Sequence, residues 1–166
     1  MSRNGDSRQV RARVVAIVTG GSSGTGLEVA RVLTRWGWEV VVVYLERQRT
    51  VDATVAEIQA ADGNVVSVRA DLADELDVQR LFAESVAAFD GVDVVVHTTT
   101  QTAALLYQHA ARHVRPRGAL VSLSGAVRVP LAVARQLRER GITIGSAHPD
   151  GLIGFLDRWR ERETIG

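Results

Sequence analysis

Short apolar runs rich in valine recur along the chain, and segments of helical periodicity separate them. Each run is almost continuously apolar and does not alternate with polar residues, which is typical of strands covered on both faces. The predicted strands are Val14–Thr19, Glu39–Tyr44, Asn64–Arg69, Asp93–His97, Ala119–Leu123 and Ile142–Ala147.

The segments between these runs place apolar residues three or four positions apart, which predicts one buried face on each helix. Asp74 is the expected N-cap of one helix, while Pro130 and Gly141 suit the first turn and the end of another. The predicted helices are Gly24–Trp36, Val51–Ile58, Val78–Phe89, Gln101–Val114 and Pro130–Arg140.

Strands that alternate with helices across short loops predict an α/β fold with parallel strands and right-handed crossovers. About six strands with helices on both faces give a Rossmann-type doubly wound sheet in the order 3-2-1-4-5-6. The length of 166 residues suits one domain. We therefore expect a single dinucleotide-binding domain over residues 13–166 and a flexible arm over residues 1–12.

Composition excludes several kinds of chemistry. The chain has no cysteine, so it has no disulfide, thiolate metal ligand or cysteine nucleophile. All 20 basic residues are arginine, so no lysine amine can serve as an acid, a Schiff base or a phosphate ligand. The net charge of +1 gives no general reason to expect nucleic acid as a partner. The longest apolar run, Val40–Leu45, is far shorter than a membrane span, so we expect a cytoplasmic protein without a membrane partner.

A glycine-rich turn, Thr19–Gly26, joins the first predicted strand to the first predicted helix. Glycines allow the tight turn and let a pyrophosphate approach the backbone, and the helix N-terminus favours negative charge. A glycine-rich loop without a ligand is the alternative, but the strand before it and the helix after it favour dinucleotide binding. The residues predicted to bind the phosphates are Gly20, Ser22, Ser23, Gly24, Thr25 and Gly26.

The spacing Thr-Gly-x-x-x-Gly-x-Gly resembles the short-chain dehydrogenase/reductase family. The resemblance is continuous over residues 14 to 97, and it resumes at Gly118–Leu123 and Gly141–Pro149. It implies a reduced short-chain dehydrogenase fold in which Asp71 and Leu72 lie beside the adenine. Within the family, the segments that look most like the β-ketoacyl carrier-protein reductases are Val40–Tyr44, Glu57–Ala60 and Leu81–Phe82.

The end of the second strand predicts which cofactor is preferred. NAD-preferring enzymes carry an acid there for the ribose 2′-hydroxyl, whereas this chain has Tyr44 with Arg47 and Arg49 just beyond it. An arginine at this place can pair bidentately with a 2′-phosphate. The resemblance therefore favours NADP(H) over NAD(H), with Tyr44 and Arg47 as cofactor-binding residues. The alternative is that both arginines only solvate the start of a helix.

The residues that follow the fourth and fifth strands depart from the family. Its Asn-Asn-Ala-Gly is replaced here by His97–Thr100, in which His97 keeps a hydrogen-bonding side chain for the cofactor but the glycine is gone. The family uses a serine and a Tyr-x-x-x-Lys pair, whereas this chain has no lysine and only Tyr44 and Tyr107. Gly125 takes the place of the serine, and Ser124 lies one residue before it.

Catalytic residues are therefore not assigned, and two functions stay open. One is an NADP(H)-dependent oxidoreductase that acts on a carbonyl or hydroxyl substrate through a non-standard site. The other is a catalytically inactive cofactor-binding protein that serves as a sensor, partner or scaffold.

Three further features can be interpreted either as functional sites or as ordinary polar surface. His109 and His113 have the i, i+4 spacing of paired metal ligands, but also of a solvated histidine pair, and we predict no metal. His148 ends the last strand, where it either transfers a proton or is merely polar. Residues 112–140 hold seven arginines and one acid, which suits a carrier-bound substrate or a solvated face. A small-molecule substrate and a homo-oligomer also remain possible.

Overall fold

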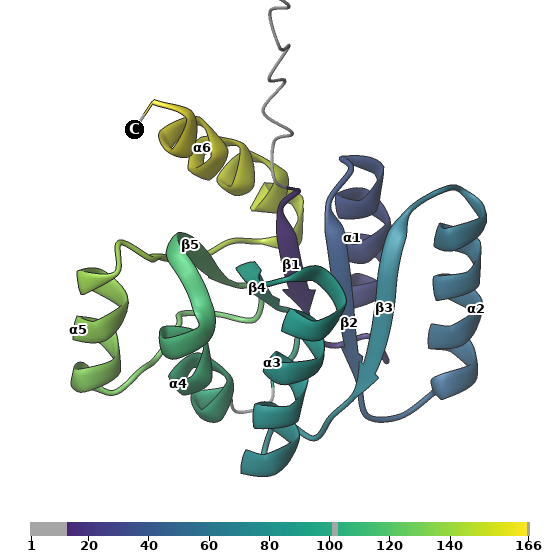
Figure 1. Ribbon diagram of the computed structural model, residues 1–166, viewed down its shortest axis with the longest axis horizontal. Coiled ribbons are helices and arrows are strands. Elements are labelled where there is room, and N and C mark those ends of the chain that lie inside the picture. Colours follow the sequence, from purple (N-terminus) through teal and green to yellow (C-terminus); the bar gives the residue numbers. More distant parts are fainter. Residues whose placement is uncertain (1–12, 101–102, 166) are drawn as a thin grey trace, which may run out of the picture.

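Six parallel strands form one sheet in the order β3-β2-β1-β4-β5-β6 (Figure 1). This computed structural model describes residues 13–100 and 103–165. The predicted arm over residues 1–12 and the first two residues of the helix predicted at Gln101–Val114 lie outside the described residues. The strand order and the parallel pairing confirm the doubly wound α/β fold.

Most elements begin and end within two residues of their predicted positions. The strands are β1 (Val15–Val18), β2 (Glu39–Tyr44), β3 (Asn64–Arg69), β4 (Val92–His97), β5 (Val114–Ser122) and β6 (Thr143–Ser146). The helices are α1 (Gly24–Arg35), α2 (Gln48–Ala60), α3 (Glu75–Phe89), α4 (Ala104–His113), α5 (Leu131–Glu139) and α6 (Leu152–Thr164), with a short 3₁₀ turn η1 (Pro149–Gly151). The predicted N-cap of α3 is confirmed, because the Asp74 carboxylate accepts the Asp77 amide at 3.0 Å.

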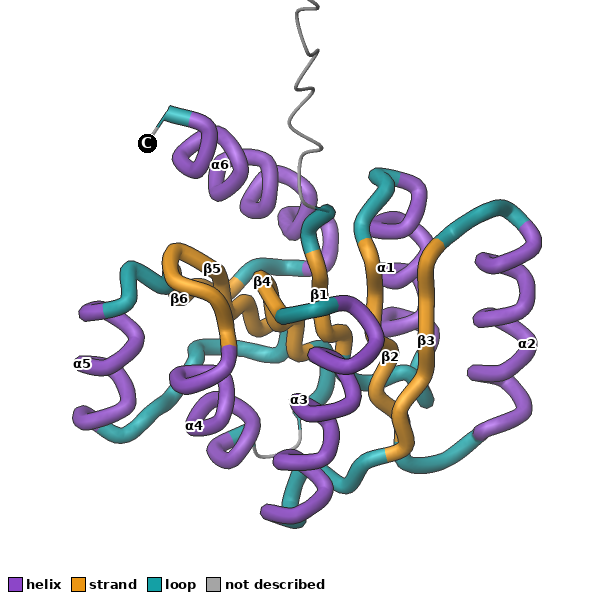
Figure 2. The backbone as a smooth tube through the Cα atoms, in the orientation of Figure 1, coloured by secondary structure: helices purple, strands orange, loops and turns teal. Residues whose placement is uncertain are grey.

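Helices cover both faces of the sheet (Figure 2), and a hydrophobic core lies on each face. Side chains of α1, α2 and α6 fill the first core, and side chains of α3, α4 and α5 fill the second. The four inner valines of β2 are all buried, and they alternate between the two cores. This double covering is the reason that the strands are almost continuously apolar.

The predicted start of β5 at Ala119 is wrong by five residues. β5 begins at Val114, directly after α4, and Val114 pairs with Val92 of β4 before the register shifts. The polar segment Arg115–Arg117 hid this first part of the strand in the sequence. Arg117 has φ +68°, which suits the irregular pairing.

Helix α6 was not predicted from the sequence. Its buried side chains Leu152, Leu156 and Trp159 join the core on the α1 face. The indole of Trp159 donates to the Arg117 carbonyl at 2.9 Å and lies edge-on to Trp38 at 6.1 Å. The i, i+4, i+7 spacing of the three buried residues is the signal that could have identified this helix. Among the described residues, no helix is long and apolar enough to span a membrane.

Candidate functional site

The turn between β1 and α1 leaves open space in front of a helix N-terminus. Gly20 has φ +77°, and a Cβ at Gly26 would collide with the Gly20 carbonyl oxygen. Both positions therefore require glycine. A Cβ at Gly24, by contrast, would meet no atom within 4 Å apart from its chain neighbours and the backbone of its own helix. Gly24 begins α1, so the open space lies where the first helical amides point and where the helix dipole is positive.

The serine hydroxyls of the turn hold its shape. Ser23 caps α1: its hydroxyl donates to the Gly20 carbonyl at 2.8 Å and accepts the Gly26 amide at 3.3 Å. The Ser22 hydroxyl donates to the Glu46 carbonyl at 2.7 Å. We expected these hydroxyls to be donors to the cofactor, but the structure gives both of them partners within the protein.

The backbone amides of Gly24 and Thr25 remain as donors for a phosphate. Both residues are exposed, and amides of the first helical turn have no partner within the helix. The turn therefore fits a dinucleotide pyrophosphate through its backbone, whereas the two serines keep that backbone in position.

The expected adenine side of the site lies after β3. Leu72 is buried, and the Asp71 carboxylate accepts the Ala73 amide at 2.9 Å. The Asp71 amide donates to the Asp77 carboxylate at 2.9 Å. This hydrogen bond, and then the Arg80 guanidinium, lower the pKa of Asp77. Asp77 was missed by the sequence reasoning, and it fixes the backbone on which Asp71 and Leu72 lie.

Tyr44 and Arg47 belong to the end of β2 and to the connection that follows it, to which Ser22 is hydrogen-bonded. Tyr44 ends β2 and is buried, whereas Arg47 is exposed and precedes α2 with φ +57°. The Ser22–Glu46 hydrogen bond ties the glycine-rich turn to this connection. The predicted pyrophosphate site and Arg47, the predicted partner of a 2′-phosphate, therefore lie on two loops that are hydrogen-bonded to each other.

His97 is held at the end of β4 by threonines. It is 2% exposed, with Nδ1 2.7 Å from the Thr19 hydroxyl and Nε2 3.5 Å from the Thr99 hydroxyl. The Thr98 hydroxyl donates to the Thr19 carbonyl at 2.8 Å. A Cβ at Gly20 would collide with the side chains of Thr98 and Thr99. These threonines therefore lie directly against the glycine-rich turn.

A pocket of about 250 Å³ opens at the ends of β4 and β5 beside α4. Tyr107 and Ser122, two of its lining residues, are 4% and 3% exposed. Burial raises the pKa of Tyr107 above its ordinary value, and the smaller effect of the Ser122 hydroxyl lowers it. Ser124, the serine that directly precedes Gly125, also lines this pocket. Tyr107 precedes β5 in the sequence, and only the packing of α4 against that strand brings its side chain to this pocket.

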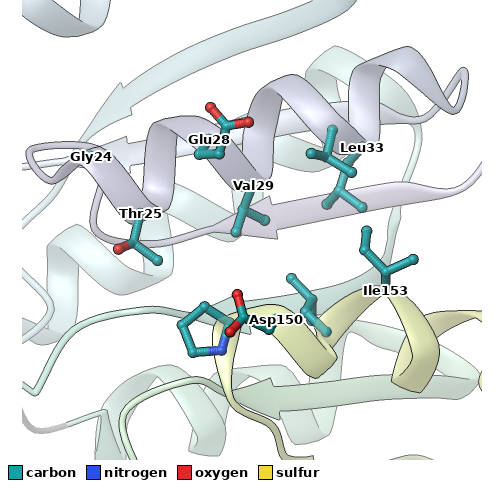
Figure 3. A pocket seen from close by; sticks show the side chains of 10 residues that line it. Gly24, Thr25, Glu28, Val29, Leu33, Asp150 and Ile153 are labelled. Carbon is teal, nitrogen blue, oxygen red and sulfur yellow. The ribbon is translucent and has the colours of Figure 1, made fainter.

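A second pocket, of about 350 Å³, lies between α1 and the start of α6 (Figure 3). Thr25, Glu28, Val29 and Leu33 face it from α1, and Ile153 faces it from α6. Since Gly24 and Thr25 also line it, the pocket begins at the predicted phosphate site and continues along an apolar helix face.

His109 and His113 line neither pocket, whereas His148 directly precedes Pro149, which lines the second pocket. The His109 imidazole contacts the Glu75 carboxylate at 2.6 Å and stacks on His113. Burial, and then the charges of His109 and nearby arginines, lower the pKa of His113. Among residues 13–100 and 103–165, no group of three or more histidine, aspartate or glutamate side chains is placed to hold a metal ion. His148 is exposed, 3.5 Å from the Asp150 carboxylate.

Comparison with known proteins agrees with this geometry. A family model described as short chain dehydrogenase matches residues 14–150. An uncharacterized oxidoreductase of Methylorubrum extorquens is 32% identical over 142 residues, which is 84% of this chain and 57% of the relative. A 3-oxoacyl-acyl-carrier-protein reductase of Synechocystis is 39% identical over 83 residues, which is 50% of this chain and 34% of the relative. The chain thus spans little more than half the length of the first relative and about a third of the second.

Solved structures show the same fold. A short chain dehydrogenase from Burkholderia cenocepacia in complex with NADP has a TM-score of 0.67 at 25% identity, covering 83% of this chain and 74% of that one. A dehydrogenase/reductase from Sinorhizobium meliloti has a TM-score of 0.64 at 27% identity, covering 82% and 71%. The family-model match extends from the residue before β1 into η1, so it includes the glycine-rich turn and all six strands. On that match the chain belongs to the short-chain dehydrogenase family.

Proposed function

We propose that this chain binds NADP(H) and acts as an oxidoreductase on a carbonyl or hydroxyl substrate through a site that differs from the family's usual one. The observation that supports it most directly is the open position at Gly24, in front of the free amides of α1. The bound dinucleotide would supply a hydride to the substrate or remove one from it. The test of binding is a fluorescence or thermal-shift titration of the purified protein with NADPH and with NADH.

The preference for NADP(H) rests on Tyr44 and Arg47. We expect NADPH to bind more tightly than NADH. Arg47→Ala should reduce the difference in binding free energy between the two nucleotides by about 1–3 kcal/mol, because a charge-assisted hydrogen bond to the 2′-phosphate is lost. Arg35→Ala, at an exposed arginine at the other end of α1, is the matched control and should leave the gap unchanged. Equal affinity of the unmutated protein for both nucleotides would contradict the preference.

Catalysis of simple ketones is expected to be slow. The chain has no lysine to lower the pKa of a phenol, and burial raises the pKa of Tyr107 instead. General acid–base help is worth about 10²–10⁴-fold in rate. We therefore expect reduction of ethyl acetoacetate by NADPH to be at least about 10²-fold slower than in a family reductase with the tyrosine–lysine pair. Turnover at that reductase's ordinary rate, measured side by side, would show that the site has been misjudged.

A cofactor-binding protein without catalysis is the second candidate. Gly125 in place of the family's serine favours it, since no side chain at that position can bind a carbonyl oxygen. The two candidates differ in one measurement, because both predict NADPH binding but only the first predicts NADPH oxidation in the presence of a carbonyl compound. For the enzyme, the exposed arginines of α4 and α5, such as Arg112 and Arg135, would favour a carrier-bound or otherwise anionic substrate.

A further inference from the structure

A chain of hydroxyl groups leads from the buried phenol of Tyr107 to the surface. Tyr107 and Ser122 line the same pocket, and the Ser122 hydroxyl lowers the pKa of the Tyr107 phenol. The Ser122 hydroxyl also lies 3.3 Å from the hydroxyl of Ser124. Tyr107 and Ser122 are buried, whereas Ser124 is exposed. All three line the pocket at the ends of β4 and β5. The pocket thus has a proton-bearing group in its wall and a hydroxyl path from that group to water.

The neighbouring residues suit chemistry at an oxygen atom. His97 lines the same pocket, and its ring lies edge-on to Tyr107 at 6.0 Å. Since the Thr19 hydroxyl holds Nδ1 of His97 at 2.7 Å, this ring is a fixed wall that limits how Tyr107 can move. Arg128 is exposed and lines the pocket as well. A cation at this position favours a developing negative charge on a substrate oxygen.

We propose that Tyr107 is the proton donor of this pocket, and that Ser122 and Ser124 resupply its proton from solvent. The proposal rests on the function proposed above and adds the residues that act in it. The carbonyl carbon of the substrate accepts the hydride that the reduced dinucleotide supplies, and the C=O π pair moves onto the oxygen. That oxygen takes the Oη proton of Tyr107. The phenolate recovers a proton from Ser122, which takes one from Ser124 and so from water.

The assignment places the acid on α4, ahead of β5, instead of on the helix that follows β5. Burial keeps the phenol of Tyr107 protonated at neutral pH, which is the form that donates. The raised pKa also makes it a weaker acid than a phenol beside a lysine. An activated carbonyl compound, such as the vicinal dione 9,10-phenanthrenequinone, is therefore the suitable probe.

The first test measures NADPH oxidation by this dione, corrected for the reaction without protein. We expect turnover by the unmutated protein and a fall in kcat of about 10²-fold in Tyr107→Phe, which keeps the ring but lacks the proton. The dissociation constant for NADPH should not change. Ser122→Ala, which keeps the phenol but interrupts the hydroxyl chain, should also lower kcat. Gln108→Ala, at the exposed neighbour on α4, is the control and should keep the full rate.

The second test does not depend on turnover. Phenolate absorbance is titrated with pH in the unmutated protein and in Tyr107→Phe, and the difference isolates Tyr107. We expect its midpoint to lie above that of an ordinary tyrosine and to fall when NADP⁺ saturates the protein, because the oxidised nicotinamide ring is positively charged. A midpoint that NADP⁺ leaves unchanged would overturn the proposal.

The outcomes separate this proposal from the one on which it rests. Absence of NADPH binding refutes the proposed function and Tyr107 together. If NADPH binds but the dione is not reduced, or if Tyr107→Phe keeps the rate within a factor of two, Tyr107 is not the donor and dinucleotide binding still stands. A kcat that declines at high pH in the unmutated protein, with this decline absent in Tyr107→Phe, supports proton donation over a purely structural role.

Discussion

Gly24→Val is expected to abolish dinucleotide binding in a protein that is still folded. The valine side chain would occupy the open space at the first turn of α1, where only the neighbouring residues and the backbone of α1 lie within 4 Å of the Cβ position. A pyrophosphate could then no longer reach the amides of Gly24 and Thr25. We expect the affinity for NADPH to fall at least about 100-fold, or ~2.8 kcal/mol. Stability should change by only about 0.5 kcal/mol, as is usual at an exposed position.

The matched control for this variant is Gly151→Val. A Cβ at Gly151 also has no other atom within 4 Å, but this residue lies in η1 and not in the turn after β1. Its replacement should leave NADPH binding unchanged. Gly26 is unsuitable as a test, because a side chain there collides with the Gly20 carbonyl oxygen and would unfold the turn itself. If Gly24→Val binds NADPH as the unmutated protein does, the phosphate is not held at α1.

Leu156→Ala should lower the free energy of unfolding by about 2–5 kcal/mol. Leu156 is completely buried in the core on the α1 face. Truncation to alanine removes buried methyl and methylene groups and leaves a cavity between α6 and the sheet. Urea denaturation followed by circular dichroism measures the effect.

Ile153→Ala is the control on the same helix. Ile153 is 36% exposed, so the change should cost well under 1 kcal/mol. Equal losses in the two variants would mean that α6 does not pack on the sheet through Leu156. The comparison also tests the one helix that the sequence patterns did not predict.

Local patterns were sufficient for most of the fold. The valine runs and the helical stripes between them predicted the strand order. Continuously apolar strands that alternate with helices indicate a parallel sheet covered on both faces, and the right-handed crossovers of such a sheet leave few possible strand orders. They failed at α6, where the charged residues on both sides of Trp159 obscure the three-residue apolar stripe. They also failed at the start of β5, where pairing with Val92 makes a strand of residues whose own sequence reads as a loop.

The site divides in the same way. Sequence alone determined the glycine-rich turn, because the glycines that a tight turn and a close backbone approach require are neighbours in the sequence. Sequence alone also established that no lysine is available. Only the tertiary structure decided that Gly24, and not Gly26, faces open space, and that Ser22 and Ser23 hold the backbone. It likewise brought Tyr107 to Ser122, 15 residues apart in the numbering. The physical reason is that contacts between α4 and β5 depend on how the whole sheet is assembled, and no local periodicity records them.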